Sequence, residues 1–376
     1  MAAALAVRPA LDGRAFAREV DALRKQIVAG LGPEDLLHLR RLERWGRLCT
    51  IAGYALAPWS FNPLAALLIA LGSSTRWLLM HHIGHRGYDK VPGVPRRFTS
   101  GVFALGWRRF VDWFDWILPE AWNYEHNVLH HYHTGEAGDP DLVERTMAEG
   151  WSNGHAMPLR YATVVFFALT WKLSYYAPTT FAAAEDQARA KRGEAPIAAW
   201  WHLFNPFWST GRAFFRRCVL PYGVARFIAL PALFLPLGKR AAAAVLLNSL
   251  LAEIFANLHS FCVIVPNHAG DDLYRFDNAE KDKAEYYARQ VMGSANYHCG
   301  NDLLDYAQIW LNYQIEHHLW PDLPMLQYQR WQPQLRALCE RHGLPYVQQG
   351  VFRRVGKLVD VMVGRTRMRR ASRLTE

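Results

Sequence analysis

The sequence predicts an all-α integral membrane protein, built from helical hairpins with a cytoplasmic helical cap. Along its 376 residues, long stretches that are nearly free of charge alternate with strongly basic ones. The net charge is +10, and basic residues flank the apolar stretches, which indicates an anionic membrane surface rather than nucleic acid as their partner. The 15 tryptophans and 16 tyrosines suit a bilayer interface, where the ring is half buried and its polar atom stays hydrated.

The chain begins with a basic segment. We expect residues 1–47 to form a cytoplasmic or interfacial lead-in, with a helix that starts at Pro33 and lies either at the interface or on the protein's own surface. The next stretch, Leu48–Leu71, contains no charged residue but is interrupted by two prolines. We therefore expect a hairpin, roughly 44–58 outward and 62–80 back, in preference to one kinked span.

Three histidine clusters punctuate the chain. They read HHIGH at 81–85, HNVLHHYH at 126–133 and QIEHH at 314–318. On an α-helix, His126 and His130 lie one turn apart, with side chains about 5–6 Å from each other on one face. His131 points about 100° away from His130, which suits a second metal ion better than the same one. Because neutral imidazole binds iron, zinc or copper, the clusters predict a metal centre.

The middle of the chain contains an expected interfacial helix, a segment that could span the membrane or lie along it, and a clear hairpin. Phe110–Trp122 mixes aromatic and acidic residues too closely for a bilayer core and predicts an interfacial helix. Arg160–Phe181 is apolar but contains Lys172, so it either spans the membrane or lies along it. The clearest hairpin joins residues 219–237 to residues 241–265 through a turn at 238–240.

The number of spans follows from the shared chemistry. If Arg160–Phe181 lies at the interface, the chain crosses the membrane four times and all three clusters lie on one side. If it spans, the third cluster lies opposite the other two. A common metal centre therefore selects four transmembrane helices in two hairpins, and the basic segments place the centre in the cytoplasm. Residues 48–330 are then the membrane domain, and residues 331–376 a basic cytoplasmic tail. Within this tail, we expect Arg353–Arg373 to be either flexible or apposed to the membrane.

In chain order the clusters read H-x3-H, H-x3-HH and Q-x2-HH, which resembles the tripartite histidine signature of the membrane fatty acid desaturase and hydroxylase superfamily. The third cluster in its setting, NYQIEHHLWPDLP (Asn312–Pro324), is similar to the branch of front-end acyl-lipid desaturases and their bacterial relatives. The resemblance runs from about Trp77 to Pro324. The three-residue spacing in the second cluster is that of the wider superfamily, since the front-end branch more often has two residues there.

The resemblance implies two iron ions held by about eight histidines. Seven match the family pattern, and His268, which follows the last span, is implied as the eighth. The implied ligands are His81, His85, His126, His130, His131, His268, His317 and His318. His82 and His133 are expected beside the ligands or in solvent, and His259 as a hydrogen-bonded core residue. His298 is expected to contact the metal centre through a water molecule.

Several residues are expected to orient the ligands rather than bind metal. Gln314 stands where many relatives have a histidine, and a neutral amide is a poorer iron ligand, so we expect it to orient a ligand or a water. Glu316 and Asp141 are expected to accept hydrogen bonds from imidazoles and fix their tautomers. Glu125, Asp139 and Asp322 have this role or cap and solvate helices.

The implied function is a fatty acid desaturase that uses dioxygen to act on an acyl-lipid, acyl-CoA or acyl-ACP substrate. The chain contains no His-Pro-Gly-Gly haem loop and no NAD or flavin fingerprint, so electrons are expected from a separate ferredoxin or cytochrome b5 with its reductase. Tryptophans and phenylalanines in 99–122 and 197–215 line an acyl tunnel or form the interface belt.

Other functions stay open. A hydroxylase, ketolase or acetylenase would use the same scaffold. A bis-histidine haem protein needs isolated histidines on facing spans, whereas these cluster at the ends of spans. A zinc-holding membrane receptor would need neither two irons nor dioxygen. The chain has no Glu-x-x-His motif, which excludes the ferritin-like diiron-carboxylate design.

Overall fold

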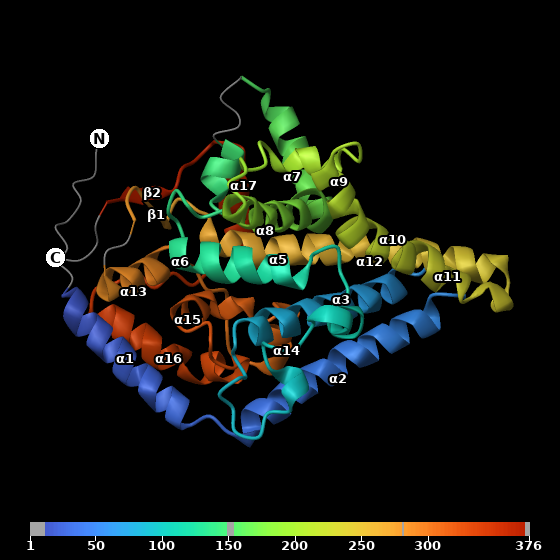
Figure 1. Ribbon diagram of the computed structural model, residues 1–376. Coiled ribbons are helices and arrows are strands. Elements are labelled where there is room, and N and C mark those ends of the chain that lie inside the picture. Colours follow the sequence, from blue (N-terminus) through green and yellow to red (C-terminus); the bar gives the residue numbers. More distant parts are fainter. Residues whose placement is uncertain (1–11, 149–153, 280–281, 373–376) are drawn as a thin grey trace.

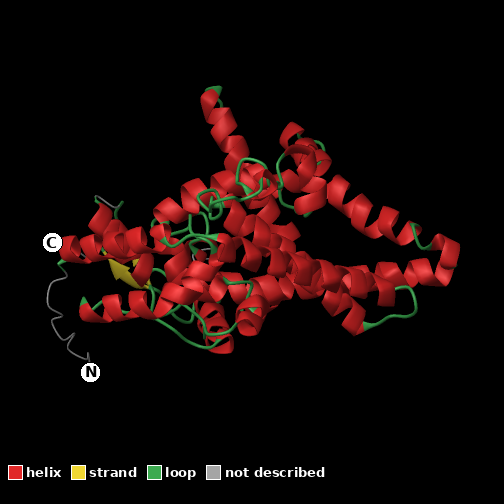
Figure 2. Ribbon diagram, turned by 90° about the horizontal axis from the view of Figure 1, so that it is seen from below, coloured by secondary structure: helices red, strands yellow, loops and turns green. Residues whose placement is uncertain are grey.

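The computed structural model describes residues 12–148, 154–279 and 282–372, and nearly all of the regular structure in these ranges is helical (Figure 2). The one sheet among them pairs β1 (Tyr274–Phe276) with β2 (Arg369–Ala371) in parallel. The predicted helical class is confirmed. Residues 1–11 of the expected lead-in and 373–376 of the expected tail lie outside the described ranges.

The first hairpin is formed by α2 (Pro33–Leu56) and α3 (Pro63–Gly84). A Cβ atom on Gly46 would lie 2.5 Å from Thr75, so glycine at this position lets the two helices approach closely. Asn62 caps α3 by accepting from the N–H of Leu64, and Pro63 occupies the first helical position. The expected start at Pro33 is confirmed, and the chain turns back between these two helices as expected. The expected outward arm at 44–58 is the second half of the helix that starts at Pro33, and its crossing of a membrane stays a prediction.

The second hairpin extends from one end of the molecule (Figure 1). Its first arm, Ser209–Leu237, contains α9 (Ser209–Phe214), α10 (Leu220–Val224) and α11 (Leu230–Ala232), joined by the π-helical turns η8 (Phe215–Val219) and η9 (Ala225–Ala229) and ended by η10 (Leu235–Leu237). Gly238, with φ of 104°, makes the turn into α12 (Lys239–Ile264), which η11 (Val265–His268) extends.

Three helices in the described ranges are long and apolar enough to cross a membrane. They are Pro63–Gly84, Ser209–Leu237 and Lys239–His268. The first half of α2 carries the arginines of the lead-in, so α2 does not belong to this set, and the count of four spans stays a prediction. The segment that could span the membrane or lie along it forms α7 (Met157–Trp171), η6 (Lys172–Tyr176) and α8 (Ala177–Lys191), with α7 packed against α12.

The expected interfacial helix over Phe110–Trp122 is wrong. The chain forms η2 (Gly106–Arg108) and α4 (Arg109–Asp112), becomes extended at Trp113, and turns helical again only in α5 (Pro119–Tyr124). Leu118 is extended because the residue before a proline avoids the helical region. Trp113 and Trp116 are buried, so these aromatic side chains belong to the core and not to the surface.

The remaining helices form a cap beside the hairpins. Their bounds are α1 (Gly13–Ala29), η1 (Arg96–Phe98), η3 (Glu125–His130), α6 (His131–His133), η4 (Glu144–Ala148), η7 (Trp200–Phe204), α13 (Lys283–Met292), α14 (Asp302–Ala307), η12 (Leu311–Tyr313), α15 (Gln314–Leu319), α16 (Met325–Arg341) and α17 (Val351–Met362). In Figure 1, α1 lies beside α13 and α16, which it contacts. Residues 351–371 are therefore folded, and the flexible tail is wrong.

Candidate metal centre

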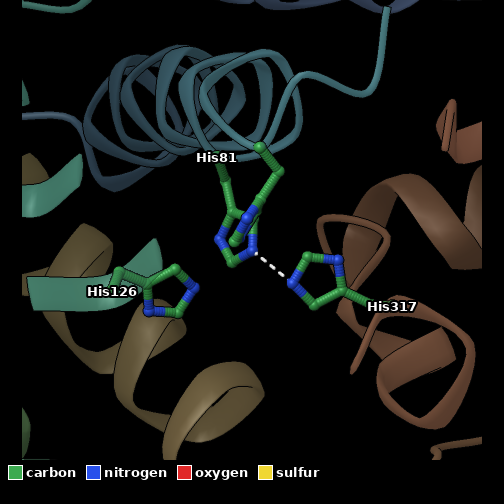
Figure 3. A group of neighbouring side chains, drawn as sticks. His81, His126 and His317 are labelled. Carbon is green, nitrogen blue, oxygen red and sulfur yellow. Dashed lines mark hydrogen bonds between the residues drawn. The ribbon is translucent and has the colours of Figure 1, made fainter. Parts of the chain in front are cut away.

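Four histidines from three separate segments form the first histidine group. His81 and His85 come from the end of α3, His126 from η3 and His317 from α15, and one ring nitrogen of each lies within 4.8 Å of the others. The ring centroids of His81 and His126 are 4.8 Å apart, and those of His81 and His317 are 4.6 Å apart. Figure 3 shows these three rings close together, with a dashed line between the Nε2 atoms of His81 and His317.

The second histidine group contains His130, His268 and His318, again with one nitrogen of each within 4.8 Å of the others. The ring centroids of His130 and His268 are 4.8 Å apart, and those of His268 and His318 are 4.4 Å apart. A third set of His126, His130 and Asp141 joins the two groups. The fold thus brings together residues that are far apart in the sequence, such as His81 and His317, which are separated by 236 positions.

The sequence suggested that the second cluster lies on an ordinary α-helix, but the structure differs. Residues Glu125–His130 form a π-helical turn, in which the N–H of His131 donates to the carbonyl of His126, five residues earlier. This wider turn brings the His131 ring to 4.9 Å from the His126 ring, while the His130 ring lies at 5.1 Å. Such π-bulges are frequent at functional sites because they change which side chains share a face.

His131 lies between the two histidine groups. Its ring centroid is 4.4 Å from that of His85 and 4.2 Å from that of His318, with which it stacks. It belongs to neither group by the spacing of its nitrogens. Its side chain is buried, and neither of its ring nitrogens has a hydrogen-bond partner among the described residues.

The pattern of unpartnered nitrogens fits metal ions. Buried polar atoms are normally hydrogen-bonded, because leaving one unpaired costs about 1–3 kcal/mol. Among the expected ligands the unpartnered ring atoms are His81 Nδ1, His85 Nε2, both nitrogens of His126 and of His131, His317 Nδ1 and His318 Nε2. Both nitrogens of the neighbouring His82, which is not an expected ligand, also lack a partner among the described residues. Burial, followed by the neighbouring imidazoles, lowers the pKa of His85, His126, His131, His317 and His318 well below the usual value. The rings are therefore neutral at pH 7, the form that binds metals.

Hydrogen bonds to Nδ1 orient the rings of the second group. His130 Nδ1 donates to Asp139 Oδ1 at 2.9 Å, and His318 Nδ1 donates to Gln290 Oε1 at 2.9 Å. His268 Nδ1 lies 3.2 Å from the carbonyl oxygen of Gly293. In His130 and His318 the bond leaves Nε2 without a partner among the described residues, as in metal sites where an acceptor fixes the tautomer of the ligand, whereas Nε2 of His268 lies 2.8 Å from Gln314 Nε2. Gln290 and Gly293 lie in a segment without any motif, so the sequence offered no signal for them.

Two of the expected orienting carboxylates have other contacts. Asp141 Oδ2 lies 4.0 Å from His130 Nδ1, so Asp139 and not Asp141 is the acceptor. Asp141 instead lies with His126 and His130, and burial raises its pKa to about 6. Glu316 accepts from Tyr346 at 2.6 Å and from Asn296 at 2.8 Å, and burial raises its pKa to about 7. Glu316 therefore anchors α15 and does not fix an imidazole.

The other carboxylates near the clusters differ in environment. Glu125 is fully buried, and neither of its oxygens has a partner among the described residues. Burial, together with Asp141 and Asp139, raises the pKa of Glu125 well above its usual range. Asp322 instead forms ion pairs with Arg24 and Lys90, and so links α1 to the segment that follows α15.

Gln314 contacts an expected ligand directly. Its Nε2 donates to His268 Nε2 at 2.8 Å, and its Oε1 lies 3.3 Å from Asn267 Nδ2. His298, by contrast, has an exposed side chain and lies outside both histidine groups. The expected contact of His298 through water therefore has no support in its surroundings.

The remaining histidines separate clearly. His82 is fully buried and packs against His317 and Tyr328, with ring centroids 5.4 and 5.8 Å away. His133 is 43% exposed at its side chain and pairs with Glu136. His259 Nδ1 lies 3.1 Å from Ser74 Oγ and its Nε2 lies 2.7 Å from the carbonyl oxygen of Ala307, which confirms a hydrogen-bonded histidine.

Two cavities are lined in part by histidines of the centre, and each has its own set of lining residues. The apolar cavity contains about 730 Å³ of empty space, and its walls are largely aromatic and aliphatic side chains, among them Phe167, Trp171, Tyr176, Phe261 and Ile264. His81, His126, His130 and His268 also line it. The polar cavity is bounded by His85 and His131 together with Asn123, Asn127, Tyr132 and Asp322. No lining residue is shared between the two.

The long apolar helices suggest association with a membrane, and the buried histidine groups are able to bind metal ions. A family model described as fatty acid desaturase matches residues 57–350. The chain belongs to the fatty acid desaturase family and is an oxidoreductase.

Curated relatives agree with this assignment. The NADPH-dependent stearoyl-CoA 9-desaturase of Mycobacterium tuberculosis is 24% identical over 91% of this chain and 77% of its own length. Fatty acid desaturase 3 of Bos taurus is 24% identical over 78% of this chain and 59% of its own length. The acyl-lipid (7-3)-desaturase of Diacronema lutheri is 30% identical over 74% of this chain and 58% of its own length.

Proposed function

We propose that this protein is a dioxygen-dependent diiron enzyme that introduces a double bond into the acyl chain of a lipid or an acyl thioester. The observation that carries the proposal is the junction of an apolar cavity with the histidine groups. His81, His126, His130 and His268 line the same cavity as Trp171, Tyr176 and Phe261. An acyl chain in this cavity would lie in an apolar environment with its methylene groups beside the metal ligands.

We assign eight histidines as ligands of two iron ions. The first ion would be held by His81, His85, His126 and His317, and the second by His130, His268 and His318, with His131 between them. Bound iron together with dioxygen supplies the oxidising power that removes hydrogen from an unactivated methylene group. Asp139, Gln290 and the Gly293 carbonyl keep the rings of the second group in one tautomer.

The reaction balances with external electrons. One dioxygen, two electrons and two protons convert the two adjacent methylene groups into an alkene and give two molecules of water. The aromatic and aliphatic walls of the apolar cavity would surround the acyl chain and limit the access of bulk water to it. A hydroxylase, ketolase or acetylenase would use the same residues, so the product distinguishes these alternatives.

We propose that a separate ferredoxin or cytochrome b5 with its reductase supplies the electrons. The chain has no haem-loop motif and no nicotinamide or flavin fingerprint. The Mycobacterium tuberculosis relative is named as NADPH-dependent, which favours NADPH as the original donor. The polar cavity supports an electron route that avoids the acyl chain, because it reaches His85 and His131 and shares no lining residue with the apolar cavity.

We further propose four membrane spans, with the second half of α2 as the fourth, and a cytoplasmic metal centre. Leu48 and Ile51 of α2 are 62% and 66% exposed, as expected for side chains that face lipid. Single cysteines at Lys239 and Arg370, both exposed positions, test this arrangement. A membrane-impermeant maleimide added to intact cells should label the first and spare the second, and equal labelling of both would overturn it.

The function itself is tested by lipid profiling. The protein is expressed in a host that has a compatible ferredoxin, and the acyl chains are analysed by mass spectrometry. We expect a product two mass units lighter than its parent, absent from cells that express the His130→Ala variant at the same level. A product sixteen mass units heavier would show that the protein is a hydroxylase and not a desaturase. An unchanged acyl profile would reject both functions.

A further inference from the structure

A third cavity lies between the first hairpin and the helix Ser209–Leu237. It contains about 1050 Å³ of empty space, part of it open to the exterior. Its lining residues are Thr50, Ile69, Ser73, Arg76, Phe110, Phe114, Tyr222, Ala225, Arg226, Ala229, Leu230 and Leu233. None of them lines the apolar or the polar cavity at the histidines, so this space is separate from the candidate metal centre.

Two arginines from different elements face this cavity. Arg76 of α3 donates from Nη1 to the carbonyl oxygen of Val111 at 2.6 Å, and Arg226 of η9 donates from Nη1 to the hydroxyl of Tyr54. Each guanidinium has five N–H donors, and these are the only hydrogen bonds that either one makes to described residues. The Nε atom of Arg226 is buried without a partner in the same ranges.

Neither arginine forms an ion pair with a carboxylate of the described residues. Among the residues that the structure describes, no aspartate or glutamate oxygen lies within 4.0 Å of either guanidinium. The acidic groups whose charges act on them already bind other donors: Glu43 binds Arg47 and Arg97, Asp112 binds Arg108, Asp115 binds Lys172, and Glu253 accepts from Trp116 and Tyr222. Glu253 is held by two neutral donors, so its charge still acts on Arg226, whereas the acidic neighbours of Arg76 are already paired with other arginines. The positive charge of Arg76 therefore has no carboxylate among the described residues to balance it.

The rest of the cavity is suited to hydrocarbon. Ile69, Leu230 and Leu233 line it next to the aromatic rings of Phe110 and Phe114. The helix Ser209–Leu237 is apolar and exposes Ile228 and Leu233 at 63% and 74%, which indicates that it faces lipid. Ionisable groups in such helices are costly unless they are paired, and basic pockets between membrane helices bind lipid head groups.

We propose that this cavity binds one phospholipid through its phosphate group. The phosphate lies between Arg76 and Arg226, and an acyl chain follows Ile69, Leu230 and Leu233. A phosphate oxygen accepts charge-assisted hydrogen bonds from guanidinium groups, which supplies the missing anion. Arg76 stands eight residues before Gly84, about 12 Å along α3 from the end that bears the histidines. The proposal does not depend on the enzyme function.

The test is native mass spectrometry of the full-length, iron-loaded protein released from micelles. Phosphatidylglycerol, diacylglycerol and inorganic phosphate are added separately as probes. We expect one phosphatidylglycerol to stay bound and diacylglycerol, which lacks the phosphate, to bind weakly. The Arg76→Gln/Arg226→Gln double variant should bind phosphatidylglycerol about 30-fold more weakly, if each arginine contributes about 1 kcal/mol. The Arg76→Lys/Arg226→Lys variant, which keeps both charges, should retain most of the binding.

Arg216→Gln is the matched control, because Arg216 is exposed on the same helix and does not line the cavity. Equal binding by the double glutamine variant and this control would overturn the proposal. Two results on the unmodified protein would also overturn it, whether or not the variants fold: equal retention of diacylglycerol and phosphatidylglycerol, or displacement of phosphatidylglycerol by millimolar inorganic phosphate, which would assign the site to the free anion.

Discussion

His130 Nδ1 lies 2.9 Å from Asp139 Oδ1, and both side chains are buried. Asp139 also accepts from the N–H groups of Gly135 and Asp141, so the carboxylate is fixed by the loop that follows the second histidine cluster. Burial alone would lower the pKa of His130, but Asp139 raises it above the usual value. Because a carboxylate only accepts, this hydrogen bond holds a proton on Nδ1, and Nε2 is the nitrogen that a neutral His130 ring could offer to a metal ion.

The first prediction concerns this carboxylate. Asp139→Asn keeps the shape of the side chain but removes its charge, so the His130 ring is held less firmly and is a weaker base. Iron affinity should fall about 10- to 100-fold, the usual loss when the acceptor behind a ligating histidine is changed. Titration with a competing chelator measures this, with Asp322→Asn as the control, since Asp322 pairs with Arg24 and Lys90. Equal iron retention in both variants would refute the role of Asp139.

The second prediction separates two histidines of one cluster. His130→Ala removes a buried ring from the second histidine group and should abolish activity while the protein stays inserted in the membrane. His133→Ala removes a ring that is 43% exposed and bound to Glu136, so it should retain most activity. Product formation by equal amounts of the two variants decides, and similar activities would show that the ligand assignment in this cluster is wrong.

The third prediction concerns His268, which stands alone in the sequence. Its ring lies 4.8 Å from the His130 ring and 4.4 Å from the His318 ring, so His268→Ala should lower both iron content and activity. His259→Ala removes hydrogen bonds to Ser74 and to the Ala307 carbonyl, and should mainly lower stability. Metal-to-protein ratios of the two purified variants test the difference. Full iron occupancy without His268 would remove this residue from the centre.

The fourth prediction uses the fully buried Arg354, which donates to the carbonyls of Pro266 and Ala269 on either side of His268, and to Asp272 at 2.6 Å. Burial alone would raise the pKa of Asp272, but Arg354 and Lys357 hold it below the usual 3.8. The lowered pKa means that the carboxylate stabilises the fold above pH 3.8, and that this contribution is lost as the pH falls through the lower folded-state pKa.

Asp272→Asn should therefore lower the free energy of unfolding at pH 7 by about 1.5–3 kcal/mol, the range for a hydrogen bond to a charged group. The difference from the unmodified protein should shrink as the pH is lowered from 5 to 3. Thermal unfolding at several pH values measures this. A gap that stays constant over this range would show that the charge of Asp272 contributes nothing.

Much of the fold was predictable from the sequence. Pro33, Pro63 and Gly238 mark helix boundaries, because proline and glycine restrict or relax the backbone at these positions. The helix start at Pro33 and both hairpins were predicted from such residues and from the long stretches that are nearly free of charge. The break after Asp112 was not predicted, because the aromatic residues around it pack into the core and tertiary packing outweighs local pattern. The folded C-terminal segment was also missed. Its many basic residues indicate an exposed segment, and the sequence does not distinguish the buried Arg354 from the others.

The site was predictable where residues are clustered in the sequence. The histidines at 81–85, 126–133 and 314–318 come together in the fold. The first cluster lies at the end of α3, the second in η3 and α6, and the third in α15. The partners that orient them were harder to find. Asp139 and Asp141 are equivalent in the sequence, and only the turn after His133 brings Asp139 to His130. Gln290 comes from α13, and no local pattern links this helix to His318.

The central claim is that the buried histidines hold two iron ions, and the most direct measurement is the metal content of the protein. The full-length chain is expressed in iron-replete medium, purified in detergent and analysed for iron and zinc by inductively coupled plasma mass spectrometry. The two histidine groups predict two irons per chain and little zinc. One zinc per chain with no iron would contradict the diiron assignment and the oxidative function that rests on it.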